Sequence, residues 1–263
     1  MTARHAPRGV IRVSGSEAAV YLQGQISQDV ESVAGGESAW SLVLDPTGKL
    51  VAWFRLWAVD GGFLIDTEPD VVDALAARLE RFKLRTDVSF AVETDGHTLE
   101  SRLDDDVDPE TETAFAWPGF HCAERLTADD ITPSIDPAYE EARIRAACPR
   151  MGVDIDGETI PGEGGQALID LSVSFSKGCY TGQELVARID SRGGNVPRPL
   201  RVVESEADVA VGAVVVFDGQ DVGVLTSAAG PVGLGRILRK AETGSEVTVD
   251  GVAARIIEPT GSR

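Results

Sequence analysis

Alternating apolar and polar residues in the first third of the chain predict β-strands. Apolar runs bounded by turn residues predict four strands, at 39–45, 49–59, 63–67 and 86–92. The first two flank the sequence DPTG at 45–48, which has Pro and Gly where a type I turn requires them. We therefore expect these two strands to form a hairpin.

Before residue 150, apolar residues at helical spacing predict three helices. The stretch SGSEAAVYLQG offers Ser14 as an N-cap, Glu17 three residues later and Gly24 as a stop. The second predicted helix is capped by Thr67 and places Val71, Leu75, Leu79 and Phe82 on one face. A third helical pattern covers 137–149. The order strand, strand, strand, helix, strand predicts an α+β domain over 1–128 with a mostly antiparallel sheet.

The pattern changes in the remainder of the chain. An acidic stretch at 103–114 has nothing to bury and is predicted to be an exposed loop. A middle segment, 129–197, includes the glycine-rich stretch 157–170, which we expect to be irregular and to lie over a surface or line a cleft. From 198 to 263, short β-rich runs alternate with glycine turns, which predicts a small β-barrel.

Composition excludes several classes of function. The net charge of −19 disfavours general binding to nucleic acid or membrane surfaces, although such a charge also serves solubility alone. No apolar run approaches the roughly 18 residues of a membrane span, and the first residues lack the apolar core of a signal peptide, so we expect a cytoplasmic protein. The three cysteines are widely spaced and form no C-x-x-C pair, so neither a disulfide framework nor a stably bound metal is expected.

One cysteine has neighbours that favour reactivity. In the sequence KGCYTGQELVARI, Thr181 and Glu184 form a predicted capping box, so Cys179 lies just before a helix N-terminus. The helix dipole and the charge of Lys177 are expected to lower the pKa of the thiol and favour a reactive thiolate. Gly178 allows the backbone to bend and leaves the sulfur approachable. The alternative is a small buried cysteine beside an ordinary helix cap.

The motif KGCYTGQELVAR, with RGG soon after it, closely resembles the signature of the YgfZ family of folate-binding proteins, which are relatives of the glycine-cleavage T-protein. Four further blocks resemble that family in the same order: LQGQISQDV, LDPTGKLVAWFRL, RLERFKLRTDVSF and RIRAACPRMGVDIDGETIP. The resemblance covers most of the chain apart from the acidic loop. It implies a cloverleaf of α+β pieces around a central channel for tetrahydrofolate.

The resemblance also implies which residues matter. Cys179 and Lys177 would act as the working pair, and the other motif residues would support them: Gly178, Tyr180, Thr181, Gly182, Gln183 and Glu184. The implied folate contacts are Gln25, Asp29, Trp53, Arg143, Arg188 and Arg192. The amide of Gln25 and the carboxylate of Asp29 suit the edge of a pterin, yet either side chain could equally be a local cap.

Two positions depart from the family pattern. Where T-proteins carry an acidic pair after the hairpin glycine, this chain has Ala52 and Trp53, which argues against aminomethyl transfer. Where many relatives have a glutamate that helps to hold the pterin, it has Arg145. A folate tail would therefore need local cations, and ARIDSRGGNVPRPLR supplies four arginines, each of which could also be a solvated surface residue: Arg188, Arg192, Arg198 and Arg201.

Three functions remain open on the sequence alone. The leading hypothesis is a folate-binding accessory protein that supports assembly or repair of iron–sulfur clusters in client or carrier proteins, with Cys179 as its thiol. One cysteine cannot hold a cluster as four do, so ligation would be transient. The alternatives are a folate-dependent aminomethyltransferase or demethylase, and a non-catalytic binding module.

Overall fold

The computed structural model describes residues 2–33, 37–93, 96–103, 106–129, 131–191 and 195–262, with the backbone alone at 190–191. The predicted hairpin is confirmed: β3 (Ser38–Leu44) pairs antiparallel with β4 (Leu50–Val59). β5 (Gly62–Thr67) follows, and β6 (Ser89–Glu93) closes the far edge. β2 (Gly9–Ser14), which the sequence pattern missed, lies between β5 and β6, so the sheet order is β3-β4-β5-β2-β6.

Two helices accompany this sheet, with caps that differ from the prediction. α1 (Ala18–Gln25) begins after Glu17 and contains Gly24, so neither Ser14 nor Gly24 bounds it. α2 (Pro69–Arg81) has Glu68 at its cap position because Thr67 still belongs to β5, where its hydroxyl donates to the Trp53 carbonyl at 3.1 Å. The apolar face predicted for α2 is buried as far as Leu79.

A second five-stranded antiparallel sheet makes up the rest of the N-terminal half, where the sequence pattern led us to expect one sheet. Its order is β10-β1-β7-β9-β8. The strands are β1 (Ala3–Pro7), β7 (Thr98–Leu103), β8 (Thr113–Trp117), β9 (Phe120–Thr127) and β10 (Ser134–Ile135). The chain passes from β1 in this sheet to β2 in the other through Arg8, whose guanidinium is buried against Asp66 at 2.7 Å.

The middle segment is more regular than its glycine content predicts. α3 (Pro137–Arg145) confirms the predicted third helix and packs against the C-terminal sheet. The glycine-rich stretch forms the short helix η2 (Pro161–Gly164) and then α4 (Gln166–Ser172), because Gly165 takes a φ of +93° between them and lets a new helix start. α5 (Gln183–Ser191) follows the cysteine motif.

The C-terminal part forms one curved sheet of seven antiparallel strands, in the order β13-β12-β16-β17-β11-β15-β14. Its strands are β11 (Leu200–Ser205), β12 (Val214–Phe217), β13 (Gln220–Val224), β14 (Ser227–Ala229), β15 (Val232–Arg236), β16 (Glu246–Val249) and β17 (Val252–Ile257). The sheet curls so that the amide of Leu238 donates to the carbonyl of Val222 at 2.8 Å, which gives half of the predicted barrel.

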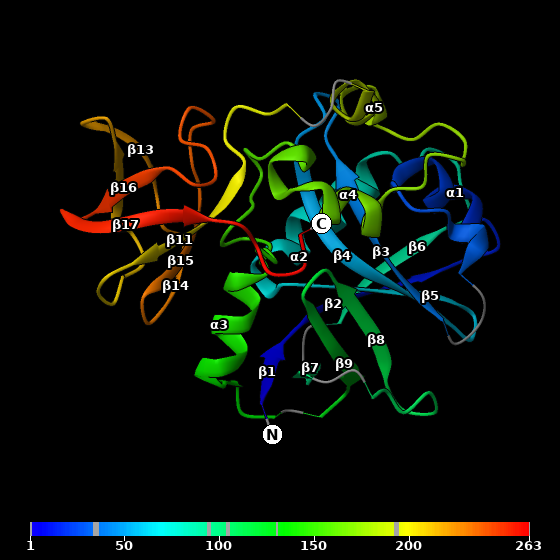
Figure 1. The fold of residues 1–263 in the computed structure, drawn as a ribbon. Helices are drawn as coiled ribbons and strands as arrows, with labels where there is room; N and C mark the ends of the chain where they lie inside the picture. Colours follow the sequence, from blue (N-terminus) through cyan, green and yellow to red (C-terminus); the bar gives the residue numbers. More distant parts are fainter. Residues whose placement is uncertain are drawn as a thin grey trace.

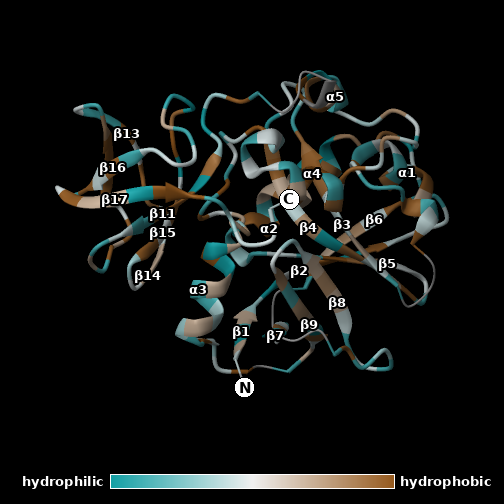
Figure 2. Ribbon diagram, in the orientation of Figure 1, coloured by the Kyte–Doolittle hydropathy of each residue, from teal (hydrophilic) through white to brown (hydrophobic). Residues whose placement is uncertain are grey.

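Figure 1 shows the C-terminal sheet on one side and the two five-stranded sheets on the other, with α3 between them. The chain returns after β17 to the middle of the molecule, where the C-terminus lies near α4 (Figure 1). Hydrophobic stretches occur along many of the strands and helices (Figure 2). One core cluster covers the two N-terminal sheets and the middle segment, and the curved C-terminal sheet encloses another.

Candidate functional site

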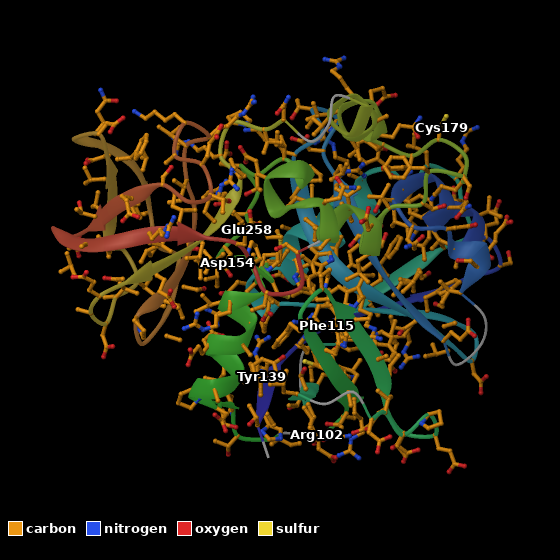
Figure 3. All side chains as sticks on the ribbon, in the orientation of Figure 1. Arg102, Phe115, Tyr139, Asp154, Cys179 and Glu258 are labelled. Atoms are coloured by element: carbon orange, nitrogen blue, oxygen red, sulfur yellow. The ribbon has the colours of Figure 1, made fainter. Side chains whose placement is uncertain are left out.

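The cysteine motif lies in the loop between α4 and α5, at the surface. Cys179 is exposed, whereas Cys122 and Cys148 are buried, so the structure excludes the buried alternative for Cys179. Figure 3 shows Cys179 at the edge of the molecule, on the loop that leads into α5. Burial, with a smaller contribution from Glu124, raises the pKa of Cys122 to about 12. Burial likewise raises the pKa of Cys148 well above its ordinary value.

Lys177 anchors this loop to the segment that follows α1. Its ammonium donates to three backbone carbonyls, those of Gln23 at 2.7 Å, Ile26 at 2.8 Å and Gln28 at 2.9 Å. Burial lowers the pKa of Lys177 to about 8, with an opposing contribution from Asp29. The amine is therefore oriented toward residues 23–28, and its first effect is to fix the backbone two residues before the thiol.

The glycines and polar residues of the motif shape the turn into α5. Gly182 has a φ of +84°, and a Cβ there would lie 2.8 Å from the carbonyl oxygen of Asp45. α5 begins at Gln183, so Thr181 precedes the cap position instead of occupying it, which corrects the predicted capping box. The side chain of Gln183 accepts from the amide of Tyr180 at 3.3 Å. Cys179 thus lies four residues before the helix.

A small cavity of 280 Å³ lies beside the thiol loop. Its lining includes Phe175, Lys177, Tyr180 and Glu184. Phe175 is 56% exposed, which is high for an aromatic side chain, and the sequence analysis did not single it out. Tyr180 is buried beneath Lys177, whose nitrogen lies 5.4 Å from the ring centroid. Gly178 has no atom within 4 Å of the position that a Cβ would take, so space alone does not require glycine there.

Gln25 and Asp29 both bond to other groups of the protein. Gln25 accepts from the guanidinium of Arg78 at 3.1 Å. The carboxylate of Asp29 accepts from the amide of Glu31 at 3.1 Å and caps the short helix η1 (Val30–Ser32). The local cap is thus observed for Asp29, whereas Gln25 contacts a side chain 53 residues later in the chain.

Trp53 and Arg143 line one cavity between the two five-stranded sheets, but that cavity is nearly filled. Its volume is 50 Å³, against about 300–1,000 Å³ for typical ligand pockets. Trp53 is buried, its ring centroid lies 4.5 Å from that of Trp40, and its indole nitrogen donates to Ser172 at 3.0 Å. Arg143 is buried in ion pairs with Glu140 at 2.6 Å and Asp154 at 2.9 Å. Both side chains are therefore engaged by other groups of the protein.

The described arginines of the stretch after the motif, Arg188, Arg198 and Arg201, differ in their surroundings. Arg188 and Arg198 are exposed, and Arg192 lies outside the described residues. Arg201 is half-buried and lines a separate cavity of 350 Å³ between α5 and the C-terminal sheet. Arg145, which replaces the family's glutamate, bridges Glu141 at 2.8 Å and Glu204 at 3.0 Å and so ties α3 to β11.

A cavity of 740 Å³ lies where four segments meet: the β8–β9 turn, the end of α3, the start of α4 and the C-terminal tail. Trp117, Gln166 and Asp170 are among the residues that line it. The indole nitrogen of Trp117 donates to the carbonyl of Ala146 at 2.9 Å, and Gln166 donates to Asp170 at 2.8 Å. Because its lining comes from segments far apart in sequence, no local pattern could have revealed this cavity.

Within the described ranges, no group of three or more His, Cys, Asp and Glu side chains is arranged to hold a metal ion. In the same ranges, no helix is long and apolar enough to cross a membrane.

Known relatives place these features in context. No family model matches the chain. An uncharacterized protein of Haemophilus influenzae is 29% identical over 205 residues, which are 71% of this chain and 67% of that protein. Proteins named tRNA-modifying protein YgfZ are 25% identical in Serratia proteamaculans (75% and 69% of the two chains) and 27% identical in Klebsiella pneumoniae (70% and 65%). The matches thus span about two thirds of these relatives.

A solved structure shares the fold. The aminomethyltransferase T of the glycine cleavage system from Bartonella henselae superposes with a TM-score of 0.73, covering 98% of this chain and 85% of that one at 16% identity. The cloverleaf arrangement and its central channel stay predictions, and the cavity between the two five-stranded sheets measures 50 Å³. The predicted resemblance is confirmed: this chain is a relative of the YgfZ proteins and has the fold of the glycine cleavage T-protein.

Proposed function

We propose that this protein is a YgfZ-type accessory protein that binds folate and supports the assembly or repair of iron–sulfur clusters through Cys179. The observation that carries the proposal is the single exposed thiol on a loop held by three hydrogen bonds from Lys177. A fixed, accessible thiol beside an open cavity is better suited to contact with another protein than to a structural role.

The thiol would bind the cluster only transiently, as a group that passes to another protein. A single thiolate cannot retain a cluster that needs about four ligands, so the other ligands would come from a client or carrier protein. The exposed ring of Phe175 and the 280 Å³ cavity beside the loop provide apolar surface for that contact.

The name of the relatives associates them with tRNA modification. A chain with a net charge of −19 is repelled by the phosphates of RNA. We therefore infer that any effect of this protein on tRNA modification passes through a client enzyme and does not require the protein to hold RNA.

The folate proposal depends on where the ligand fits. The cavity that contains Trp53 and Arg143 is too small, whereas the 740 Å³ cavity is within the range of typical ligand pockets. Trp117, which is only 2% exposed, forms part of its wall, and Gln166 and Asp170 provide polar side chains. A carboxylate and an amide suit the donor and acceptor edge of a pterin. We propose this cavity, and not the space around Trp53, as the folate site.

The test is complementation of a deletion strain with the wild type, Cys179→Ser or Cys122→Ser. The readouts are the activities of iron–sulfur enzymes and the level of modified tRNA nucleosides. We expect Cys179→Ser to fail and Cys122→Ser, at a buried position, to complement if it folds. Full complementation by Cys179→Ser at equal protein level would reject the thiol-based role and favour a non-catalytic binding module. Tetrahydrofolate titration of the wild type and Trp117→Leu tests the ligand separately.

A further inference from the structure

The 350 Å³ cavity between α5, η2 and the C-terminal sheet has a charge opposite to that of the whole protein. The chain carries −19, yet the charged residues among the described residues that line this cavity are two arginines, Arg201 and Arg239. Much of the remaining lining is apolar, including Ile169, Val186 and Ile189. A low-dielectric cavity with two cations attracts an anion more strongly than an exposed pair of arginines would.

Both arginines have unused hydrogen-bonding capacity. The Nη1 atom of Arg201 donates to Thr243 at 3.1 Å, but its Nε atom is buried and has no partner among the described residues. Burial lowers the pKa of Arg201, whereas the charges of Glu258 and Glu242 raise it. Neither glutamate is among the residues that line the cavity. Arg239 also lines the cavity and is exposed. Its side chain has no hydrogen-bond or ion-pair partner within the part of the chain that the structure describes. A buried guanidinium nitrogen without a partner is costly, and a carboxylate would satisfy it.

This cavity adjoins the larger one of 740 Å³. Gly165, Gln166 and Leu200 line both. Nothing lies within 4 Å of the position that a Cβ would take at Gly165, and its φ of +93° disfavours any residue with a side chain. The start of α4 is therefore a wall that the two cavities share.

We propose that the 350 Å³ cavity binds the carboxylates of a ligand whose body lies in the 740 Å³ cavity. This inference rests on the proposed function, in which that ligand is a folate. The group that reaches Arg201 and Arg239 is then the glutamyl tail, and added glutamates should strengthen binding. The arginine pair assigns the tail to residues that differ from the surface arginines Arg188 and Arg198.

The experiment compares 5-formyltetrahydrofolate carrying one or three glutamates by calorimetric titration. The proteins are the wild type, Arg201→Gln, Arg239→Gln, the double variant and Arg255→Gln. Arg255 is an exposed arginine of the same sheet and serves as the matched control. We expect the triglutamate to bind the wild type and Arg255→Gln at least about tenfold more tightly than the monoglutamate, and the double variant to lose most of that preference.

Additional measurements distinguish the possible outcomes of this titration. Melting temperatures identify variants that do not fold, and Arg201→Lys, which keeps the charge, should retain part of the preference for the triglutamate. Free tri-γ-glutamate tests whether the cavity serves an unattached anion. Arginine-dependent binding of that peptide without any tail-length effect on folates would overturn the tail assignment, as would folate binding that ignores both arginines. Failure of every folate to bind would reject the proposed folate site together with this inference.

Discussion

Arg55 of β4 and Glu124 of β9 form an ion pair that joins the two five-stranded sheets inside the core. The Nη1 and Oε2 atoms are 2.6 Å apart, and the side chains are only 3% and 5% exposed. Burial raises the pKa of Glu124, and Arg55 opposes that rise. The second carboxylate oxygen of Glu124 accepts from Ser101 at 3.0 Å. The pair therefore holds the two sheets against each other, although removing its two charges from water costs free energy.

Glu124→Gln should be strongly destabilising because it leaves the Arg55 charge buried without a counter-ion. We expect a loss of about 3–5 kcal/mol in the free energy of unfolding, measured in urea. The double variant Arg55→Met/Glu124→Leu should recover most of the loss. The control is Glu100→Gln, which removes the exposed pair between Glu100 and Arg125 in the same sheet and should cost under about 1 kcal/mol. Equal losses for Glu100→Gln and Glu124→Gln would contradict this account.

The sequence predicts the elements whose signals are local. The hairpin β3–β4, α2, α3 and the strands after residue 198 other than β14 were expected, because each combines an apolar period with a turn or breaker beside it. β1 and β2 were missed because Arg4 and Arg12 interrupt their apolar patterns. In the folded chain Arg4 is paired with Glu68 and Arg12 with Glu93. Such compensation by a distant residue is invisible in a local window.

The candidate site likewise has features that the sequence predicts and features that it does not. The thiol motif could be found from sequence because its residues are contiguous, whereas the acceptors of Lys177 lie about 150 positions earlier in the chain. Asp29 and Gln25 have residue types suited to a ligand, yet nearby backbone and side-chain groups use them first. Cavities and their charge come from tertiary packing, so the pairing of Arg201 with Arg239 had no signal in the sequence.

Removal of the Lys177 amine should loosen the thiol loop. Lys177→Met leaves three carbonyls without their shared donor, and we expect a loss of about 1–3 kcal/mol in the free energy of unfolding near pH 7. Lys240→Met, at an exposed lysine, is the control and should change little. A Lys177→Met protein as stable as the wild type would show that water replaces the amine at no cost.

The contribution of Lys177 to the free energy of unfolding should depend on pH. The pKa of Lys177 is about 8 in the folded chain and about 10.4 in the unfolded one. Between these values the unfolded state holds a proton that the folded state has lost, so the contribution of Lys177 to stability should rise with pH. The difference in unfolding free energy between wild type and Lys177→Met, measured at pH 7.5 and 9.5, should grow. A constant or shrinking difference would show that the ammonium persists in the folded state.

Cys179 should react with iodoacetamide faster than the other two cysteines near neutral pH. It is exposed, whereas burial blocks access to Cys122 and Cys148 and raises their pKa values. Site-resolved mass spectrometry of briefly alkylated native protein measures the three rates. In denaturant the rates should converge, which provides the internal control. Native labelling of Cys122 or Cys148 at the rate of Cys179 would mean that the core opens readily.

The protein should not catalyse aminomethyl transfer, although it shares the fold of an aminomethyltransferase. Ala52 and Trp53 are buried and provide no carboxylate at the reacting amine. The acids that line the adjoining cavity, Glu68 and Glu124, are held in ion pairs with Arg8 and Arg55. Loss of a general acid or base typically costs about 10²–10⁴ in rate.

The assay follows methylenetetrahydrofolate formation from aminomethylated glycine-cleavage carrier protein, with a T-protein run in parallel. We expect no turnover above the uncatalysed background. Trp53→Asp should not restore activity, because the new carboxylate would lie in the 50 Å³ space beside Trp40 and would favour its neutral form there. Turnover by the wild type within tenfold of the T-protein would revive the transferase alternative and would require a proton acceptor other than the residues at 52 and 53.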